Sequence, residues 1–148
     1  MRETGRSGCP INLALEVLGD RWSLLILRDM IFAGKRTFNQ LLDSDEGIAT
    51  NVLRDRLNCL VDRGLLTKSD DPERKGRTRY ALTERAITLV PVLVQLGHWG
   101  EHWLPADPAL RRVNRRLVTG GPALWETIMD ELRVTAGPAA AVSRGART

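Results

Sequence analysis

The chain has 148 residues, of which 43% are hydrophobic, and its 22 basic and 18 acidic side chains give a formal net charge of +4. This length and apolar content suffice to bury a core, which excludes a wholly disordered chain. No apolar run approaches the ~20 residues that a membrane-spanning helix needs, so we expect no membrane partner. Its two cysteines, Cys9 and Cys59, match neither a disulfide framework nor a spaced zinc motif. We therefore expect a cytoplasmic protein without a metal or other cofactor.

Helical patterns dominate the first part of the chain. Residues 1–8 are polar and lack an apolar period, so we expect a flexible arm there. A short helix is predicted over residues 11–18, and a mostly apolar second helix should follow it. Thr37 and Gln40 form a capping box that predicts the start of a third helix. A fourth helix is predicted over about residues 49–63, with leucines along one face and polar side chains on the other.

The pattern then changes to that of short strands. Residues 65–68 and 78–82 predict a hairpin whose connecting segment is charged and rich in turn-forming residues. A long helix is predicted over residues 84–104, with a kink at Pro91. Proline and glycine interrupt the region beyond it, where we expect one further helix over residues 123–134.

This order of elements predicts a mainly α fold with a small β hairpin, of the winged helix-turn-helix type. Short segments in a fixed order strengthen the prediction: Cys9-Pro10, Gly19-Asp20-Arg21-Trp22, Phe38-Asn39-Gln40-Leu41, Gly47-Ile48-Ala49-Thr50-Asn51-Val52-Leu53, Arg56-Leu57, Gly64-Leu65, Tyr80-Ala81-Leu82-Thr83 and Trp99-Gly100. In these segments the chain closely resembles the HxlR family of transcriptional regulators. Two positions depart from the common family pattern, namely Ala49 in place of a capping Ser and Ala86 in place of Gly.

The resemblance implies a DNA-binding and dimerisation domain over residues 9–104, which pairs with a second copy through its N-terminal and C-terminal helices. Residues 105–134 are then a C-terminal helical extension, and residues 135–148 are expected to form a disordered tail. Two recognition helices ~34 Å apart would read a pseudo-palindromic operator on double-stranded DNA. The predicted function is that of a non-enzymatic, sequence-specific regulator, which the resemblance favours as a homodimeric repressor. Release by a small-molecule or electrophile effector is left open.

The polar face of the fourth helix supplies candidate contacts with bases, because Asn suits adenine and Arg suits guanine in the major groove. These candidates are Asn51, Arg54, Asp55 and Asn58. Candidate phosphate contacts at helix starts are Thr37, Asn39 and Thr50. Basic side chains of the hairpin, which would contact the minor groove and phosphates, are Arg74, Lys75, Arg77 and Arg79. Amphipathic helices and charged turns also occur in proteins that bind no DNA, so the family resemblance carries much of this assignment.

Cys9 is a candidate redox-sensing residue. It precedes Pro10 near the amino end of the first helix, where the helix dipole lowers the pKa of a thiol. In the family resemblance it matches the position of the redox or electrophile sensor of some members. A purely structural role for Cys9 is equally open, and Cys59 is expected in packing contacts.

Two other functions are also open. His98, Glu101 and His102 match the His-x-x-Glu-His pattern of inverted zinc peptidases, although the chain has no other histidine to complete the site. We expect instead that Trp99 and Trp103 anchor this helix while the histidines and the glutamate face solvent or a partner. The other alternative is an interaction module that binds an acidic partner through the hairpin and a second basic cluster, Arg111, Arg112, Arg115 and Arg116. We expect that cluster to be a solvated helix face.

Overall fold

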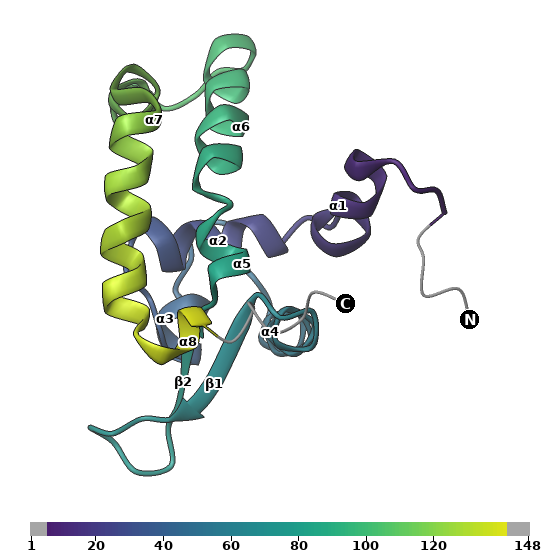
Figure 1. The fold of residues 1–148 in the computed structure, drawn as a ribbon, viewed down its shortest axis with the longest axis vertical. Coiled ribbons are helices and arrows are strands. Elements are labelled where there is room, and N and C mark those ends of the chain that lie inside the picture. The colour runs from purple at the N-terminus through teal and green to yellow at the C-terminus, as the bar shows by residue number, and fades with distance from the viewer. Residues whose placement is uncertain (1–5, 142–148) are drawn as a thin grey trace. The chain divides into compact units, whose positions relative to one another are not determined.

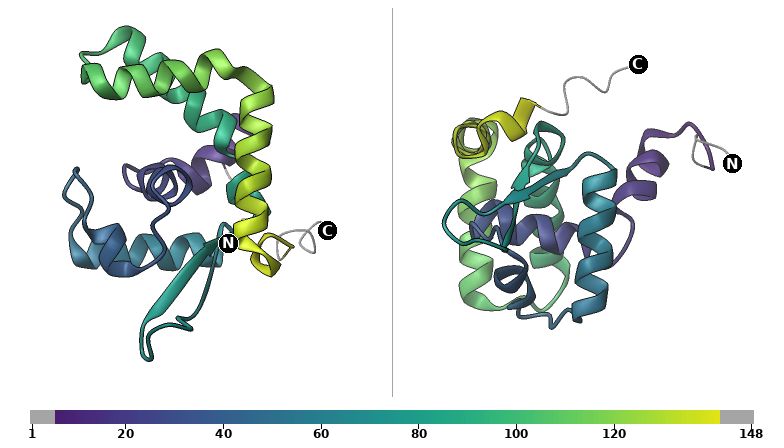
Figure 2. Two further views of the ribbon diagram at one scale, coloured as in Figure 1. Left: turned by 90° about the vertical axis from the view of Figure 1, so that its left-hand side faces the viewer. Right: turned by 90° about the horizontal axis from the view of Figure 1, so that it is seen from below.

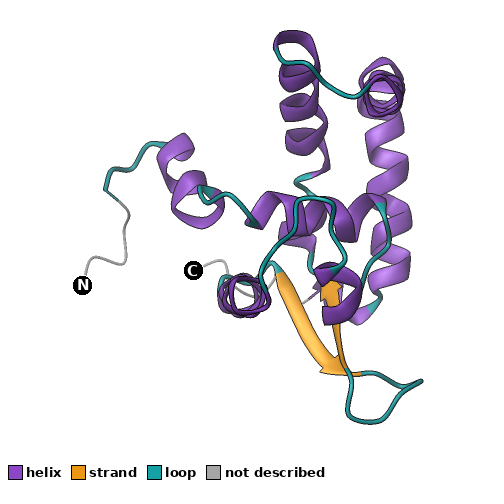
Figure 3. Cartoon of the chain, turned by 180° about the vertical axis from the view of Figure 1, so that it is seen from behind, coloured by secondary structure: helices purple, strands orange, loops and turns teal. Residues whose placement is uncertain are grey.

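The computed structural model describes residues 6–141 and is mainly helical, with one two-stranded sheet (Figures 1 and 3). Its elements are α1 (Pro10–Leu18), α2 (Ser23–Phe32), α3 (Phe38–Leu42), α4 (Thr50–Asp62), β1 (Leu66–Asp70), β2 (Thr78–Leu82), α5 (Glu84–Ile87), α6 (Val90–Trp103), α7 (Pro108–Ala136) and α8 (Pro138–Ala141). The predicted fold class is thus confirmed. The chain divides into two compact units, which are described separately. The first contains residues up to 63 together with 68–80, and the second contains 64–67 and the residues from 81 onward.

In the first unit, local caps fix where the helices begin. Asp20 Oδ1 accepts hydrogen bonds from the backbone N–H groups of Trp22 and Ser23, both at 2.8 Å, at the start of α2. The predicted capping box of α3 is confirmed, because Thr37 Oγ1 accepts from Gln40 N and Gln40 Oε1 accepts from Thr37 N. These bonds satisfy amide groups that a helix start otherwise leaves without a partner.

The leucine stripe of α4 is also confirmed. Leu53, Leu57 and Leu60 are buried, which turns the polar face of α4 toward solvent. No side chain caps the start of α4, where Ala49 stands, in keeping with the departure from the family pattern. Gly64 has a φ of +76°, which a residue with a side chain rarely adopts, and so permits the chain to leave α4 and enter the hairpin.

In the second unit, the prediction of one long helix over 84–104 is wrong. The chain forms α5 and α6 as separate helices, and Pro91 lies in the first turn of α6 rather than at a kink. A continuous helix would bring the Pro91 ring against the carbonyl of Ile87, whereas a first turn needs no N–H from proline. α6 then continues through Gly97, where an added Cβ would lie 2.4 Å from Asn114 Oδ1 of α7. The absence of a side chain there therefore permits close packing of the two helices.

The extension is more helical than the sequence pattern predicts. α7 covers residues 108–136 and bends at Gly121, whose φ of 64° and ψ of −163° are not helical (Figure 2). Asp107 caps its start through the N–H groups of Ala109 and Leu110. Beyond the bend, Pro122 occupies a position that needs no N–H donor, and the segment 123–134 is helical as predicted. Its buried side chains are Trp125, Met129 and Leu132.

The predicted arm and tail lie partly outside the described residues, which exclude 1–5 and 142–148. Of the arm, Arg6 contacts Glu16 of α1 at 3.1 Å. The first residues of the predicted tail, 135–141, belong largely to the end of α7 and to α8 and are therefore helical in the structure. Within residues 6–141, no helix is long and apolar enough to cross a membrane.

A bidentate ion pair in the first unit joins α2 to the turn that precedes α4. Arg28 donates from Nη1 and Nη2 to the two carboxylate oxygens of Glu46, each at 2.7 Å. These bonds lower the pKa of Glu46 from 4.5 to about 2. The ionised carboxylate is thus the form that the folded chain favours.

Replacing Glu46 with Gln should lower the free energy of unfolding by about 0.5–1 kcal/mol at neutral pH, because the pair is partly exposed to solvent. Because the pKa of Glu46 is lower in the folded chain than in the unfolded chain, the ion pair stabilises the fold at pH values above 4.5. This stabilisation is lost as the pH falls from 4.5 toward 2. Urea unfolding at several pH values measures the difference, with Asp45→Asn as the control for loss of a neighbouring exposed carboxylate. If the difference in free energy of unfolding between wild type and Glu46→Gln stays constant as the pH falls to about 2, the stabilising role of the ionised Glu46 is contradicted.

Candidate nucleic-acid interface

The exposed face of α4 carries the side chains that the sequence nominates for base contacts. Asn51, Arg54, Asp55 and Asn58 are all exposed, and so is Thr50 at the first position of the helix. Asp55 pairs with Arg56, with its Oδ2 2.6 Å from Arg56 Nη2. Part of the negative charge on this face is therefore compensated within the helix.

Arg54 is held by an aromatic ring from another helix. Its guanidinium lies 5.3 Å from the centroid of Phe38, the first residue of α3. A guanidinium at this distance over a ring is attracted by the ring's electron-rich face, and the ring restricts its rotamers. Phe38 was not among the predicted site residues, although it belongs to the Phe38-Asn39-Gln40-Leu41 segment of the family resemblance and directly follows the helix cap.

Three separate segments of the first unit line one pocket of about 290 Å³. Its lining residues come from the start of α3, from α4 and from the hairpin: Thr37, Phe38, Asn39, Arg54, Gly76, Arg77, Thr78 and Tyr80. The hairpin is attached to the start of α3 by an antiparallel bridge between Thr37 and Arg79. The Tyr80 N–H also donates to the Arg36 carbonyl at 2.7 Å. Four predicted site residues, Thr37, Asn39, Arg54 and Arg77, thus surround one concave surface.

The two candidates at the start of α3 differ in accessibility. Thr37 is buried and its hydroxyl serves as the helix cap. Asn39 is exposed. Of the two side chains, Asn39 is therefore the one available to a ligand at this rim of the pocket.

The basic side chains of the hairpin fall into two groups. Arg74 and Lys75 are exposed at the tip, whereas Arg77 and Arg79 are half-buried. Arg77 pairs with Asp71, whose side chain is inaccessible to solvent. Asp71 also accepts from the Glu73 N–H at 2.9 Å, and this bond together with Arg77 lowers the pKa of the Asp71 carboxyl.

Asp71 therefore organises the connection between the two strands, and it neutralises part of the Arg77 charge. Asp71 was not among the predicted site residues, although an aspartate before Pro72 is a common turn signal. Its buried carboxylate makes Arg77 part of the hairpin's structure as well as of its surface.

The two cysteine thiols differ in their exposure to solvent. Cys9 is exposed at the position before α1, and hydrogen bonds from the backbone N–H groups of Asn12 and Ile11 lower the pKa of its thiol. Cys59 is half-buried on α4, where Arg56 Nη2 lies 3.6 Å from its sulfur. Cys9 thus combines accessibility with a thiol whose pKa is lowered.

The expected arrangement around His98 and His102 is confirmed for the two histidines, which are exposed, but it is wrong for the tryptophans and for Glu101. Trp99 and Trp103 are 58% and 68% exposed, and Glu101 is buried with only 9% of its surface accessible. The reason is that α6 packs against α7 through the face that carries Glu101. In the described part of the chain, no group of three or more His, Cys, Asp or Glu side chains could hold a metal ion.

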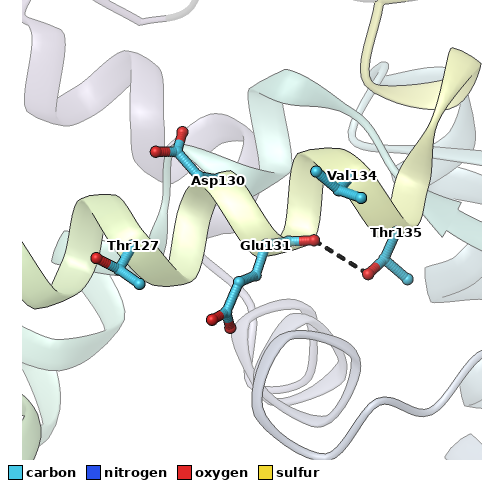
Figure 4. Close-up of a pocket in the computed structure, with 5 residues that line it drawn as sticks. All are labelled: Thr127, Asp130, Glu131, Val134 and Thr135. Carbon is cyan, nitrogen blue, oxygen red and sulfur yellow. Dashed lines mark hydrogen bonds between the residues drawn. The ribbon is translucent and has the colours of Figure 1, made fainter.

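A shallow pocket of about 450 Å³ on α7 offers a contrast with the pocket of the first unit (Figure 4). Its lining residues are Thr127, Asp130, Glu131, Val134 and Thr135. The Thr135 hydroxyl donates to the Glu131 carbonyl at 3.0 Å, and the two charged groups are carboxylates. Such a surface repels phosphate, so it is no candidate for nucleic-acid binding.

Comparison with known proteins places this geometry in a family. Residues 17–108 match the family model described as HxlR-like helix-turn-helix. The chain is 38% identical over 105 residues to the uncharacterized HTH-type transcriptional regulator sll1512 of Synechocystis, covering 71% of this chain and 76% of that protein. It is 43% identical over 101 residues to the similarly named Rv3095 of Mycobacterium tuberculosis. That match covers 66% of this chain but only 61% of the mycobacterial protein.

Solved structures agree with the family. PA1607, a candidate transcription factor, aligns with a TM-score of 0.63 and 36% identity over 70% of both chains. The redox regulator HypR in its oxidized form aligns with a TM-score of 0.56 and 28% identity, over 67% of this chain and 99% of HypR. Reduced YodB from Bacillus subtilis, a transcriptional regulator, aligns with a TM-score of 0.54 and 25% identity, over 68% of this chain and all of that one. The chain therefore has the predicted winged-helix fold and belongs to the HxlR-like helix-turn-helix family of transcriptional regulators.

Proposed function

We propose that this regulator binds operator DNA sequence-specifically in the cytoplasm, as a homodimer and without catalytic activity of its own. The observation that carries the proposal is the exposed polar face of α4 beside the pocket in which Arg54 stacks on Phe38. An exposed helix face with amide and guanidinium side chains suits the major groove. The hairpin beside it provides cationic groups for the phosphate backbone.

Each candidate side chain has a proposed role. Base edges are contacted by Asn51, Arg54 and Asn58, and Asp55 accepts from a cytosine amine or remains with Arg56. Phosphates are contacted by Asn39, by Thr50 and by the exposed tip of the hairpin, with Arg79 supporting them from the strand. Thr37 and Arg77 contribute mainly by holding their segments in place, because one is a helix cap and the other pairs with a buried carboxylate.

Arg54→Ala should weaken binding to a selected operator by about 1–3 kcal/mol and relax discrimination at one base position. Lys75→Ala should weaken all duplexes alike and reduce the salt slope of log K by about 0.9, because it removes one phosphate contact. Lys75 is a better test than Arg77, whose removal would take the ion-pair partner from the buried carboxylate of Asp71. Fluorescence anisotropy with selected and scrambled duplexes, at several salt concentrations, measures both effects.

If the wild-type protein binds selected and scrambled duplexes equally at every salt concentration, the proposal fails. The alternative of a module that binds an acidic protein partner would then be favoured. Identical effects of the two substitutions would contradict the proposed division of roles between α4 and the hairpin.

Exposed apolar side chains support the homodimer. On α1 they are Ile11, Leu13 and Leu15, and on α6 they are Val92, Leu96, Trp99 and Trp103. The α6 residues recur at the spacing of one helix face, and a continuous apolar stripe of this kind is typical of an interface. A second copy of the chain is the proposed partner, since a single reading helix buries little surface for operator affinity.

Trp99→Glu should convert the dimer to monomer and reduce operator affinity, because two carboxylates would be buried in the interface without partners. Thr119→Glu is the matched control, since it adds the same charge at an exposed position of α7, outside the proposed interface. Light scattering after gel filtration measures the mass. A wild-type monomer at micromolar concentration, or a dimer that survives Trp99→Glu, would contradict the proposed interface.

We further propose that the protein represses transcription and that modification of Cys9 releases it from DNA. The exposed thiol with its lowered pKa supports this, as does likeness to HypR, which is named a redox regulator. For modification to act as a switch, the modified thiol must favour a dimer arrangement with lower operator affinity.

Diamide should weaken operator binding by the wild type and by Cys59→Ser, and a reductant should restore it. Cys9→Ser should keep its operator affinity throughout. Anisotropy together with mass spectrometry of the modified protein gives the affinity and the extent of modification. If all three proteins respond alike, or if none responds when Cys9 is fully modified, Cys9 is not the sensor.

A further inference from the structure

A second pocket lies in the second unit, where α6 is followed by α7. Its volume is about 610 Å³, within the range of small-ligand sites. Pro105, Ala106 and Pro108 form apolar walls, and the remaining lining residues are Arg111, Arg112 and Arg115. These arginines lie beyond residues 17–108, the part of the chain that the family model matches. The pocket thus depends on α7.

One carboxylate is buried behind this pocket. Glu101 is nine-tenths buried, and its Oε2 lies 3.6 Å from Arg111 Nε and 3.4 Å from Arg115 Nε. Its Oε1 lies 3.7 Å from His98 Nδ1. These separations are ion-pair distances, longer than good hydrogen bonds. The carboxylate therefore attracts the two arginines without saturating their donors.

Unpaired polar atoms concentrate at the same place. Among the described residues, the buried side-chain nitrogen and oxygen atoms without a hydrogen-bond partner are Glu101 Oε2, Arg111 Nε and Asn114 Nδ2. All three belong to the contact between α6 and α7. Buried polar atoms nearly always have a hydrogen-bond partner, so each of these unpaired atoms calls for an explanation, and a functional role is one of them. Of the three, Arg111 also lines the pocket.

The arginines keep capacity for a further anion. Arg112 has no ion pair or hydrogen bond to any residue in the described range 6–141, and the Arg115 side chain is 62% exposed. The nearby carboxylate of Asp107 is occupied, because it accepts from two backbone N–H groups at the start of α7. The three guanidinium groups thus carry more positive charge than the single carboxylate of Glu101 neutralises. They also lie near the amino end of α7, where the helix dipole favours negative charge.

We propose that this pocket binds a small organic acid, through a carboxylate carried on an apolar body. The guanidinium groups of Arg112 and Arg115 would receive the carboxylate in bidentate fashion, and the prolines and Ala106 would contact the body of the ligand. Glu101 is a positioning residue, which holds Arg111 and Arg115 at the edge of the pocket. The basic cluster of α7 is then a ligand site rather than the solvated helix face that the sequence pattern favours.

Isothermal titration of the full chain tests the proposal with benzoate and hexanoate as probes. Benzamide serves as the uncharged counterpart of benzoate, and inorganic phosphate as an anion without an apolar body. We expect one site per chain for benzoate and hexanoate, and no measurable binding of benzamide. Arg112→Gln and Arg115→Gln should each weaken benzoate binding about ten-fold, because each removes a charge-assisted hydrogen bond.

Arg116→Gln is the matched control, since Arg116 belongs to the same cluster but does not line the pocket. Circular dichroism establishes that the variants fold. The proposal is overturned if wild type binds neither acid, if phosphate binds as tightly as benzoate, or if all three variants behave alike. It is also overturned if Arg112→Gln and Arg115→Gln weaken binding of random duplex DNA while leaving benzoate binding unchanged, because the cluster would then be a nucleic-acid contact.

Discussion

The main-chain bridge between Thr37 and Arg79 is the contact on which the rest of the candidate interface depends. Together with the hydrogen bond from Tyr80 N to the Arg36 carbonyl, it attaches β2 to the start of α3. This attachment places the hairpin beside α3, while the packing of α3 on α4 brings Phe38 beneath Arg54. A backbone attachment of this kind tolerates changes in side chains, so the residues around the pocket can vary with the operator while the frame is kept.

Charge in this region is more balanced than the number of basic residues indicates. Asp71 compensates Arg77 within the hairpin, and Asp55 compensates Arg56 on α4. Fewer cations are therefore available to phosphates than the sequence of the hairpin implies, and counterion release contributes correspondingly less to affinity. A smaller electrostatic contribution leaves a larger share of the binding free energy to base contacts, which favours specificity over affinity.

Local signals in the sequence predicted the local structure. The capping box at Thr37, the leucine stripe of α4 and the hairpin each depend on residues that are neighbours in the chain. The stacking of Arg54 on Phe38 and the burial of Glu101 depend instead on contacts between separate helices, which neither periodicity nor spacing reveals. The error at Trp99 has the same origin, because an apolar residue on a helix fits a core and a partner surface equally well. The sequence pattern also does not predict the break before α6, because a proline such as Pro91 permits either a kink or a new helix start.

Nuclear magnetic resonance of the isotope-labelled protein, titrated with a duplex selected from random DNA, tests the central claim most directly. Amide and side-chain signals of α4 from Thr50 to Asn58, of Asn39 and of the hairpin tip should shift or broaden with the selected duplex. A scrambled duplex should perturb the hairpin tip while leaving the Asn51 and Arg54 side-chain signals nearly unchanged, because phosphate contacts carry no sequence information. Perturbations that spare α4 and centre on Arg111, Arg112 and Arg115 would contradict the assignment of α4 as the reading helix.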